Sequence, residues 1–470
     1  MLGTKQRDFK THAHFSLEDI VPADNFYRQL EAHIDLEFVH ILVQDLYSPI
    51  GRPSIDPVVF FKLQLIAFFE DIRSERQLMK LVTLNLAHRW YLGYDLDERV
   101  PDHSSLTKIR ERYGLKVFQL FFEQIVAKCV EAGLVWGEEL YFDSTKVLAN
   151  AAINNMITQA EFEAVYYLDQ LFPSNEETPS FSKVVEKYDG KRVLGIRKAY
   201  YKRVADQKIG PVDPHASPMP SSKGGAAVLG YRDHYVVDGG KARVILSALV
   251  TPASIMDNTP MLDLTDWVCS RWEIQPGIVV GDAKYGTVKN IAGLEQTGIK
   301  AFVPIPDLSK RNQFYPAADF QYDVEKDQHI CPQGHPLPLM SRRKNEELFV
   351  YRADKNSCDT CPVKDECTKS KSGRHIFRSF YQEYVERVKA YHSTNEYQKA
   401  MSKRAFWVEP LFGEAKDFHR LRRFRLRGLL KVNIEGVMIA AGQNIKRLLK
   451  HALDNFYCFF TRPISSYSFH

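Results

Sequence analysis

The sequence predicts an α/β protein in three parts: an N-terminal helical region, a mixed sheet with helices packed on it, and a cysteine-bearing insertion. Apolar residues at three- and four-residue spacing predict the helical region over residues 1–135. Short apolar and β-branched runs, bounded by turn residues, predict strands that begin at Leu140 and continue to about Pro304. Four of the seven cysteines fall between residues 331 and 367, and they mark the insertion.

Composition narrows the class of protein. With 470 residues, 44% of them hydrophobic, the chain can bury a full core and should contain two or three domains. Lys and Arg outnumber Asp and Glu by 63 to 58, and the net charge of +5 is too small to indicate a partner. Because no signal-peptide segment and no run of about 18 apolar residues is present, we expect a cytoplasmic protein without a membrane span. Seven cysteines are few for a disulfide scaffold, and the clustering of four of them favours a metal site over disulfides.

Capping residues begin two of the expected N-terminal helices. Asp56, followed by proline, predicts a helix over residues 58–70. The cluster Pro-Asp-His-Ser-Ser precedes a second helix over residues 106–112. Phenylalanines at helical spacing predict a third over residues 118–129, which Gly133 ends. We expect a compact bundle of short helices, whose basic side chains suit either a DNA groove or a solvated surface.

The central strand is expected at residues 140–147, with the sequence Leu-Tyr-Phe-Asp-Ser-Thr-Lys-Val. This run displays Asp143 from the middle of a sheet. A buried carboxylate is costly unless it is paired or holds a metal ion, so Asp143 needs a partner elsewhere in the chain.

The order of the following elements predicts a mixed sheet with helices packed on it. Residues 151–208 are expected to be an added helical segment, and residues 211–225 a loop. The sheet then resumes with a hairpin over residues 231–250, a helix to Trp272, a strand over 277–282 that ends at Asp282, a helix over 286–298 and a strand over 300–304. Beyond it, residues 307–380 look polar and irregular, residues 381–450 look helical, and the end of the chain is an uninformative tail.

Three acids stand out by context: Asp143, Asp282 and Glu409. Transfer at a phosphodiester uses divalent cations, and carboxylates from separate elements are the ligands that hold Mg²⁺ or Mn²⁺. An acid near a strand is also often a turn cap or a surface residue. Three other acids are equally visible by composition, and spacing does not separate them from the first three: Asp233, Asp238 and Asp257.

A resemblance separates them. The chain resembles the DDE-type insertion-sequence transposases over about residues 15–450, through Asp143-Ser-Thr-Lys, Val280-Gly-Asp282-Ala-Lys-Tyr-Gly and Val408-Glu409-Pro-Leu-Phe-Gly. Its N-terminal region is similar to the helical domain of that group over residues 47–57, 74–78 and 101–110. The resemblance implies an RNase H-like mixed sheet with flanking helices, preceded by an all-α domain and interrupted by the cysteine-bearing insertion.

The resemblance also implies residue roles. Asp143, Asp282 and Glu409 would be the catalytic residues and would bind two Mg²⁺ or Mn²⁺ ions. Arg404 and Lys416 match basic residues that flank the glutamate on the same helix in related transposases. Arg404 stands one position early, and the tyrosine of the related signature is missing, so Glu414 is the alternative glutamate.

The segment around the glutamate is basic. Between residues 403 and 431, nine Lys or Arg oppose three acids, a local charge of +6. A continuous helix would bring Glu409, Lys416, Arg420 and Arg427 near one face. We predict phosphate contacts over the alternative of a solvated helix. The predicted DNA-binding residues are Arg404, Lys416, Arg420, Arg422, Arg423 and Arg427.

The cysteine segment has five candidate metal ligands. Cys358 and Cys361 form a C-x2-C pair, which supplies two ligands of a tetrahedral zinc site. Cys331 with His335 could supply the other two, and Cys367 is a fifth candidate. A structural zinc, in a zinc-ribbon-like insertion, and reduced thiols in a metal-free loop are the two interpretations.

The sequence therefore predicts a DNA transposase that cleaves the ends of an insertion sequence and transfers them to target DNA. We expect a nucleoid-associated homodimer on double-stranded DNA with inverted-repeat ends. A nuclease without strand transfer and a catalytically silent DNA-binding protein are the alternatives. The expected domains follow the chain in order. Residues 1–135 form a helical DNA-binding domain, and residues 136–306 form the first part of the catalytic core, with an insertion at 151–228. Residues 307–380 form the cysteine-bearing insertion, residues 381–455 the C-terminal helical part of the core, and residues 456–470 a tail.

Overall fold

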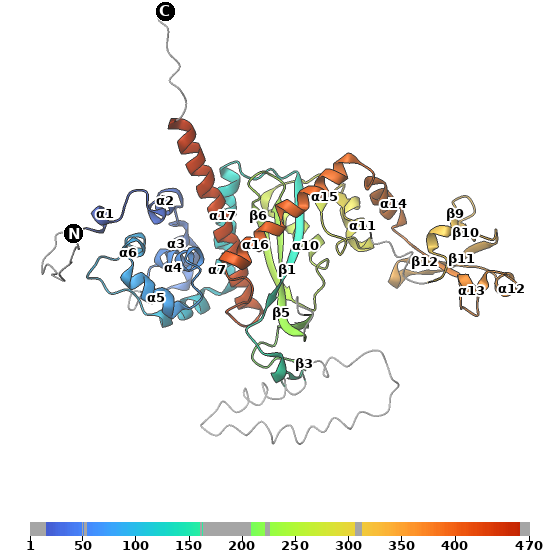
Figure 1. Ribbon diagram of the computed structural model, residues 1–470, viewed down its shortest axis with the longest axis horizontal. Helices are drawn as coiled ribbons and strands as arrows, with labels where there is room; N and C mark the ends of the chain where they lie inside the picture. The colour runs from blue at the N-terminus through green and yellow to red at the C-terminus, as the bar shows by residue number, and fades with distance from the viewer. Residues whose placement is uncertain are drawn as a thin grey trace, which may run out of the picture.

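The computed structural model of the protein describes residues 16–48, 50, 54–159, 162, 208–220, 226–305 and 313–460. Most of the helical segment expected at residues 151–208 lies outside these residues. Along the long axis of the molecule, the N-terminal helices lie at one end, the main sheet lies in the middle and a small second sheet lies at the other end (Figure 1).

The main sheet is built around β1 (Glu139–Leu148). Leu140, Tyr141 and Phe142 are all buried, as expected for a strand that is covered on both faces. The strand pairs antiparallel with β5 (Val228–Asp238) on one side and parallel with β7 (Ile278–Val280) on the other. These pairings confirm the predicted central strand.

The remaining strands complete an RNase H-like sheet. On one side, β6 (Ile245–Pro252) and β4 (Ser217–Met219) both pair antiparallel with β5. On the other side, β8 (Lys300–Phe302) pairs parallel with β7. The order β6-β5-β1-β7-β8, with β5 antiparallel to its neighbours, is the strand order of the RNase H-like fold, as predicted. The helices α10 (Met261–Trp272) and α11 (Val288–Gln296) connect the later strands.

Two asparagines of α17 (Leu429–Phe460) protect the edge of the sheet. The Asn433 side chain accepts from Val250 N at 2.8 Å and donates to Val250 O at 2.9 Å. Asn444 makes the same pair of bonds with the backbone of Ile245, at 2.9 and 2.8 Å. These buried amides position α17 and pair with backbone groups at the edge of β6. Unpaired backbone groups at a sheet edge can bind strands of other molecules and so promote aggregation.

The N-terminal region is helical, as predicted. Its helices are α1 (Leu17–Ile20), α2 (Phe26–His33), α3 (Phe38–Val43), α4 (Pro57–Phe69), α5 (Glu75–Leu84), α6 (Leu86–Leu92) and α7 (His103–Glu131). The Asp56 side chain caps α4 by accepting from Val58 N at 2.7 Å. The two short helices expected within residues 106–129 are parts of α7, separated by a local break at Gly114, where φ is +59°.

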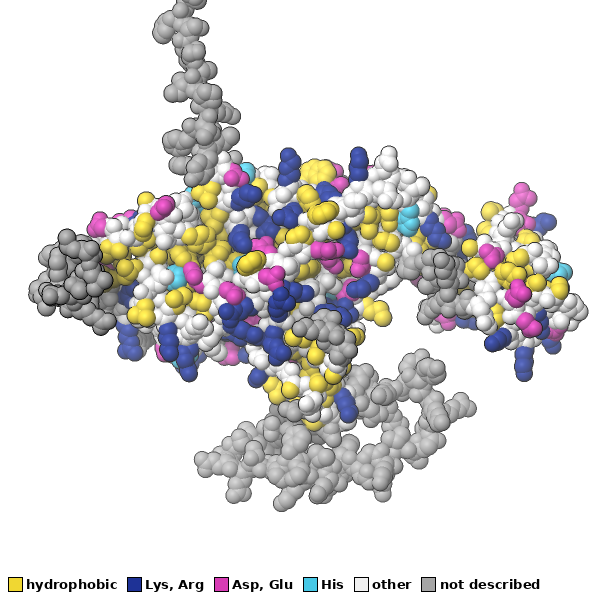
Figure 2. All heavy atoms as spheres, viewed as in Figure 1, with side chains coloured by type: hydrophobic (Ala, Val, Ile, Leu, Met, Phe, Trp, Pro, Cys, Tyr) yellow, Lys and Arg dark blue, Asp and Glu magenta, His cyan; other side chains and the backbone are white. Residues whose placement is uncertain are grey.

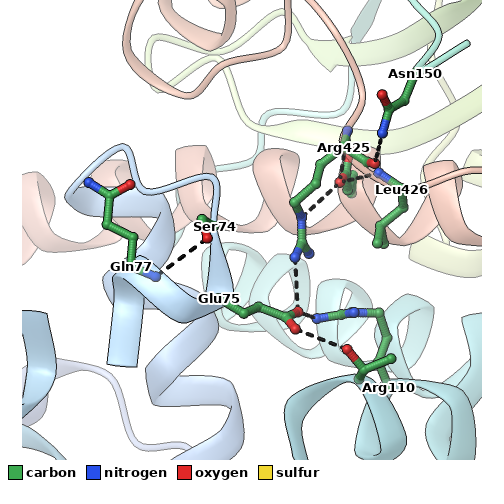
Figure 3. Close-up of polar contacts among 9 residues, drawn as sticks. Ser74, Glu75, Gln77, Arg110, Asn150, Arg425 and Leu426 are labelled. Atoms are coloured by element: carbon green, nitrogen blue, oxygen red, sulfur yellow. Dashed lines mark hydrogen bonds and ion pairs between the residues drawn. The ribbon is translucent and has the colours of Figure 1, made fainter. Parts of the chain in front are cut away.

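Helix α17 packs on both α7 and β6, and the N-terminal helices share one hydrophobic core with the main sheet. An ion-pair cluster strengthens this junction (Figure 3). Glu75 accepts from the buried Arg110 guanidinium and, at 2.9 Å, from Arg425. Glu435 accepts from the backbone N–H groups of Arg425 and Leu426 at 2.8 and 2.9 Å.

Replacing Glu75 with Gln is expected to lower the free energy of unfolding by about 2 kcal/mol, because Arg110 would stay buried without its counter-ion. Urea denaturation of the full chain would measure the loss. Glu111→Gln is the matched control, since Glu111 joins the same two regions through an exposed 3.0 Å pair with Lys431. Equal losses in the two variants would show that the buried cluster does not stabilise the junction.

The cysteine-bearing segment is more regular than its sequence indicates. It forms an antiparallel sheet of β9 (Gln321–Asp323), β10 (Gln328–Ile330), β11 (Pro336–Arg343), β12 (Leu348–Arg352) and β13 (His375–Ser379), with the short helices α12 (Lys355–Asp359) and α13 (Lys364–Cys367). The expectation of irregular structure was wrong because these strands expose many side chains, so that the apolar alternation typical of a half-buried strand is weak.

The C-terminal region is helical, but it is not continuous where we expected. It contains α14 (Gln382–Tyr391), α15 (Asn395–Trp407) and α16 (Glu409–Phe418) before α17. Arg404 therefore lies on α15, whereas Glu409 and Lys416 lie on α16. The break falls beside Pro410, which lacks the N–H that would continue the α15 ladder and is tolerated in the first turn of α16.

Arg420 and Arg427 are not on a helix with Glu409, contrary to the prediction. Arg420 has φ of +55°, which ends the helical path after α16. The next residues run beside the end of β1, where Leu148 N donates to Arg422 O at 3.1 Å and Phe424 N donates to Leu148 O at 2.9 Å. These long-range backbone bonds replace the helical bonds that local spacing favours.

No helix in the described part of the chain is both long enough and apolar enough to cross a membrane.

Candidate active site

Strand β1 presents Asp143 near the centre of the main sheet. The side chain is only 16% exposed, and its Oδ1 atom accepts from Ser144 N at 2.8 Å. Tyr235 is its register partner on β5 and stacks on Phe412 of α16, with ring centroids 4.4 Å apart. This stack holds α16 against the face of the sheet on which Asp143 lies.

Arg404 joins two of the predicted catalytic acids. Its Nη1 atom lies 3.4 Å from Asp143 Oδ2, and its Nη2 atom lies 3.7 Å from Glu409 Oε1. Arg404 occupies the last turn of α15, and Glu409 begins α16, so the break between these helices lets one guanidinium reach both carboxylates. The fold thus brings together residues that are more than 260 positions apart in the chain.

Asp282 follows β7, the parallel neighbour of β1. Its Oδ1 atom accepts from Lys284 N at 2.8 Å, which fixes the turn after the strand. The negative charges of Asp282 and Glu409 both act on Asp143. Asp282 and Glu409 therefore both lie near enough to Asp143 for their charges to act on it.

Burial raises the pKa of Asp143 to about 6. The Arg404 charge and the Ser144 N–H oppose this effect, whereas Asp282 and Glu409 add to it. A carboxyl group in this environment is stabilised in its ionised form by a nearby cation. Arg404 supplies such a charge here.

The donor chemistry of the three acids suits a hard divalent cation, because carboxylate oxygens are the ligands that Mg²⁺ and Mn²⁺ prefer. The arrangement of these acids, however, does not form a complete metal-binding site. Within the described ranges, no group of three or more His, Cys, Asp or Glu side chains is arranged to hold a metal ion. To converge on a cation, the side chains of Asp143 and Glu409 would have to turn away from Arg404.

Lys416 extends the site along β1. Its Nζ atom donates to Thr145 Oγ1. Burial lowers the pKa of Lys416, and Arg422 lowers it further, whereas Asp143 and Asp233 oppose the shift. Lys416 thus lies between two acids on one face of the sheet.

Asp233 is a polar residue that the sequence did not single out as functional. It is the register partner of Thr145, is fully buried, and has no hydrogen-bond partner for either carboxylate oxygen among the described residues. Burial raises its pKa well above the usual range, and Lys416 opposes the shift. The sequence signal that could have identified Asp233 is the alternation of side chains along a strand. Asp233 and Tyr235 are two residues apart on β5, so they lie on the same face of the sheet.

The alternative glutamate, Glu414, faces away from Asp143. It pairs with Lys446, lies 3.6 Å from Arg447 Nη2, and accepts from Gln443 Nε2 at 3.1 Å, all on α17. Burial alone would raise its pKa, but His419, Lys446 and Arg447 together lower it. Glu414 thus anchors α16 to α17, whereas Glu409 lies at Arg404.

Two of the other acids have structural partners. Asp238 accepts from the backbone N–H groups of Gly137 and Gly240, both at 2.7 Å, and so caps turns. Asp257 pairs with Arg232 and, at 2.8 Å, with Lys284.

The predicted phosphate-binding residues divide into two groups. Arg404 and Lys416 lie at the carboxylates. The others lie on the segment from His419 to Gly428, here called the basic segment. Arg420 pairs with Asp71 at 2.8 Å, and Arg422 pairs with Asp417. Arg427 donates to Asn150 O at 2.9 Å, and Arg423 is exposed. Lys and Arg side chains gather near the lower part of the sheet in Figure 2.

A cavity of about 120 Å³ lies between the basic segment and the N-terminal helices. Five arginines are among its lining residues, against three acids. The basic residues are Arg73, Arg110, Arg420, Arg423 and Arg425, and the acids are Asp71, Glu75 and Glu435. Burial lowers the pKa of Arg73, and repulsion from Arg423, Arg420 and Arg425 adds to this effect. The excess of positive charge favours an anion near this junction.

Two family models match separate parts of the chain. A transposase domain model (DUF772) matches residues 15–112, and a transposase DDE domain model matches residues 330–449. Glu409 lies within the second match, whereas Asp143 and Asp282 lie between the two. No curated protein matches the chain.

One solved structure is similar, the cryo-EM structure of a piggyBac transposase synaptic complex with hairpin DNA. It is 10% identical over 94% of this chain and 78% of that chain, and the TM-score is 0.34. The two matched models and the RNase H-like sheet agree with the sequence prediction. Both matched models are transposase domains, so the chain is similar to DDE-type transposases over residues 15–112 and 330–449.

Proposed function

We propose that the protein cuts DNA at the ends of an insertion sequence and joins the freed 3′-hydroxyl to target DNA. The observation that carries this proposal is the approach of Asp143 on β1 and Glu409 on α16 to one guanidinium, that of Arg404. Asp282, which follows the neighbouring parallel strand β7, completes the acidic group. The proposed role of residues 1–135 is to bind DNA.

The carboxylates would hold two Mg²⁺ or Mn²⁺ ions, and bound ions of this kind polarise a phosphodiester and activate the attacking oxygen. Asp143 supplies a ligand from a rigid strand, and Glu409 supplies one from the first turn of a helix. Arg404, once released from the acids, would contact the phosphate oxygens, as an arginine fork does. Lys416 would contribute a second positive charge beside Asp143.

DNA would lie across the basic segment. Its backbone bonds to Leu148 tie it to the strand that carries Asp143, so a phosphate bound there is held at a fixed place relative to the acids. Arg423 is exposed and makes no ion pair with any residue in the described ranges, which leaves its charge available for DNA.

Removing Arg423 is expected to weaken binding to all DNA sequences alike and to reduce the salt dependence by about one phosphate contact. Binding of Arg423→Ala to end-containing and unrelated DNA, measured over a series of salt concentrations, would test this. Arg343→Ala on β11 is the control, because its side chain pairs with Glu346 far along the chain from the basic segment. An unchanged salt slope for Arg423→Ala would argue against DNA on this segment.

The experiment for the reaction is incubation of the purified full chain with DNA that carries both ends of its element, in Mg²⁺ or Mn²⁺. Cuts at the ends, followed by joined products with target DNA, would support the proposal. Cutting without joining would identify a nuclease, and binding without cutting would identify a silent DNA-binding protein. Sedimentation of the protein with paired ends would test for the expected homodimer.

A further inference from the structure

The cysteine-bearing insertion has a very small core of its own. Five buried residues form it, separate from the main core: Phe320, Leu337, Tyr351, Ala353 and Ile376. Domains of this size rarely gain enough stability from such a core, and many contain disulfides or a structural metal. The cysteines of the insertion are free thiols.

These four thiols come from different parts of the insertion and line the same cavity. Cys331 follows β10, Cys358 lies in α12, Cys361 follows that helix, and Cys367 ends α13. All four line one cavity of about 30 Å³.

A tight turn at Cys331 places a backbone N–H group beside its sulfur. Gly334, with φ of +81°, donates to Cys331 O at 2.8 Å, and Cys331 N donates to His335 O at 2.9 Å. This turn directs the His335 backbone N–H to Cys331 Sγ at 3.3 Å. An N–H that donates to sulfur stabilises a thiolate, as outer partners of metal ligands do.

The other ligands are held by short helical turns. Asp354 caps α12 by accepting from Ser357 N at 3.0 Å, and Cys361 N donates to Cys358 O at 3.3 Å. Gly373, with φ of +94°, passes so close that an added Cβ would lie 3.6 Å from Cys358 Sγ and only 2.5 Å from Ala353 O. The loop before β13 therefore closes over this thiol.

We propose that Cys331, Cys358, Cys361 and Cys367 bind one structural zinc ion that fastens α12 and α13 to the sheet of the insertion. Four thiolates in a tetrahedral arrangement with one C-x2-C pair are typical of structural zinc. Zinc binding would displace the thiol protons to solvent and require rotation of the cysteine side chains, since the thiols are not already arranged around one point.

His335 would not be a ligand. Its side chain is exposed, and its backbone supplies the N–H to Cys331. His335 lines the same cavity as the four cysteines, and the proposal assigns it the role of a neighbour and not of a ligand.

Elemental analysis of the full chain, purified without chelators, tests this site. The expected result is one zinc per chain, retained in His335→Ala and in the control Cys269→Ser, whose thiol lies on α10. Cys331→Ser and Cys367→Ser are each expected to lose most of the zinc. Absence of zinc, stoichiometric iron, or retention of zinc in Cys367→Ser together with its loss in His335→Ala would overturn the proposal.

A second measurement covers the case in which the serine variants do not fold. Parent protein that is stripped with a chelator and reloaded with Co²⁺ should show the visible spectrum of a tetrahedral tetrathiolate site. Chelation should also speed proteolytic cleavage within residues 313–380 relative to the main sheet. A cobalt spectrum with nitrogen coordination, or equal cleavage with and without metal, would contradict the assignment. Neither readout depends on transposition.

Discussion

Asp143→Asn is expected to remove DNA cleavage and joining almost completely. The substitution keeps the size of the side chain but removes the charge that would bind a metal ion. Loss of a partner outside the metal ligands typically costs about 10- to 100-fold in activity, so loss of a direct ligand should exceed about 100-fold. Single-turnover assays on end-containing DNA, with Mg²⁺ and with Mn²⁺, would measure the effect.

The same variant should fold at least as well as the parent protein. Burial raises the pKa of Asp143 to about 6, so ionisation of this group at neutral pH opposes folding. The neutral amide of the variant removes that cost, and DNA binding by the basic segment should be unchanged. Asp266→Asn is the control for activity, because Asp266 is exposed on α10. Parental rates in Asp143→Asn would show that the proposed acidic group is not the catalytic site.

Elements of the main sheet could be predicted from the sequence because their signals are local. The strand at residues 140–147 is a continuous apolar run, and the hairpin of β5 and β6 is marked by Gly-Gly between alternating segments. Both lie within a few residues of the predicted positions. Burial on both faces of β1 makes such runs easy to recognise.

The parts that could not be predicted depend on long-range contacts. Residues 419–428 have helical spacing, but Leu148 offers the backbone of residues 422 and 424 an alternative set of hydrogen bonds. The neighbours of Glu409 and Glu414 depend on where one helix ends and the next begins, and on α17, which follows both in the chain. The spacing of residues along the sequence predicts neither the ends of these helices nor the position of α17.

Glu414→Gln is expected to destabilise the protein by about 3 kcal/mol at neutral pH, the largest stability effect that we expect. Breaking a buried ion pair is costly because the remaining charge stays buried. Here Arg447, with a side chain that is 12% exposed, would lose its carboxylate, and Lys446 and His419 would lose the same partner. Shifts in urea denaturation midpoints at pH 7 would measure the loss.

The loss should depend on pH in one direction. The pKa of Glu414 lies below its usual value in the folded protein, so the carboxylate contributes its full stability above about pH 4.5. That contribution fades as the pH falls below this value, because the unfolded chain then takes up the proton first. The parent and Glu414→Gln should therefore converge in stability toward acid pH.

Glu396→Gln is the control. It breaks an exposed 3.0 Å pair with Lys300 and should cost less than about 1 kcal/mol at either pH. If Glu414→Gln lost the same stability at pH 7 and at pH 3.5, the ionised carboxylate could not be the source of the effect, and the packing of α16 on α17 would account for it instead.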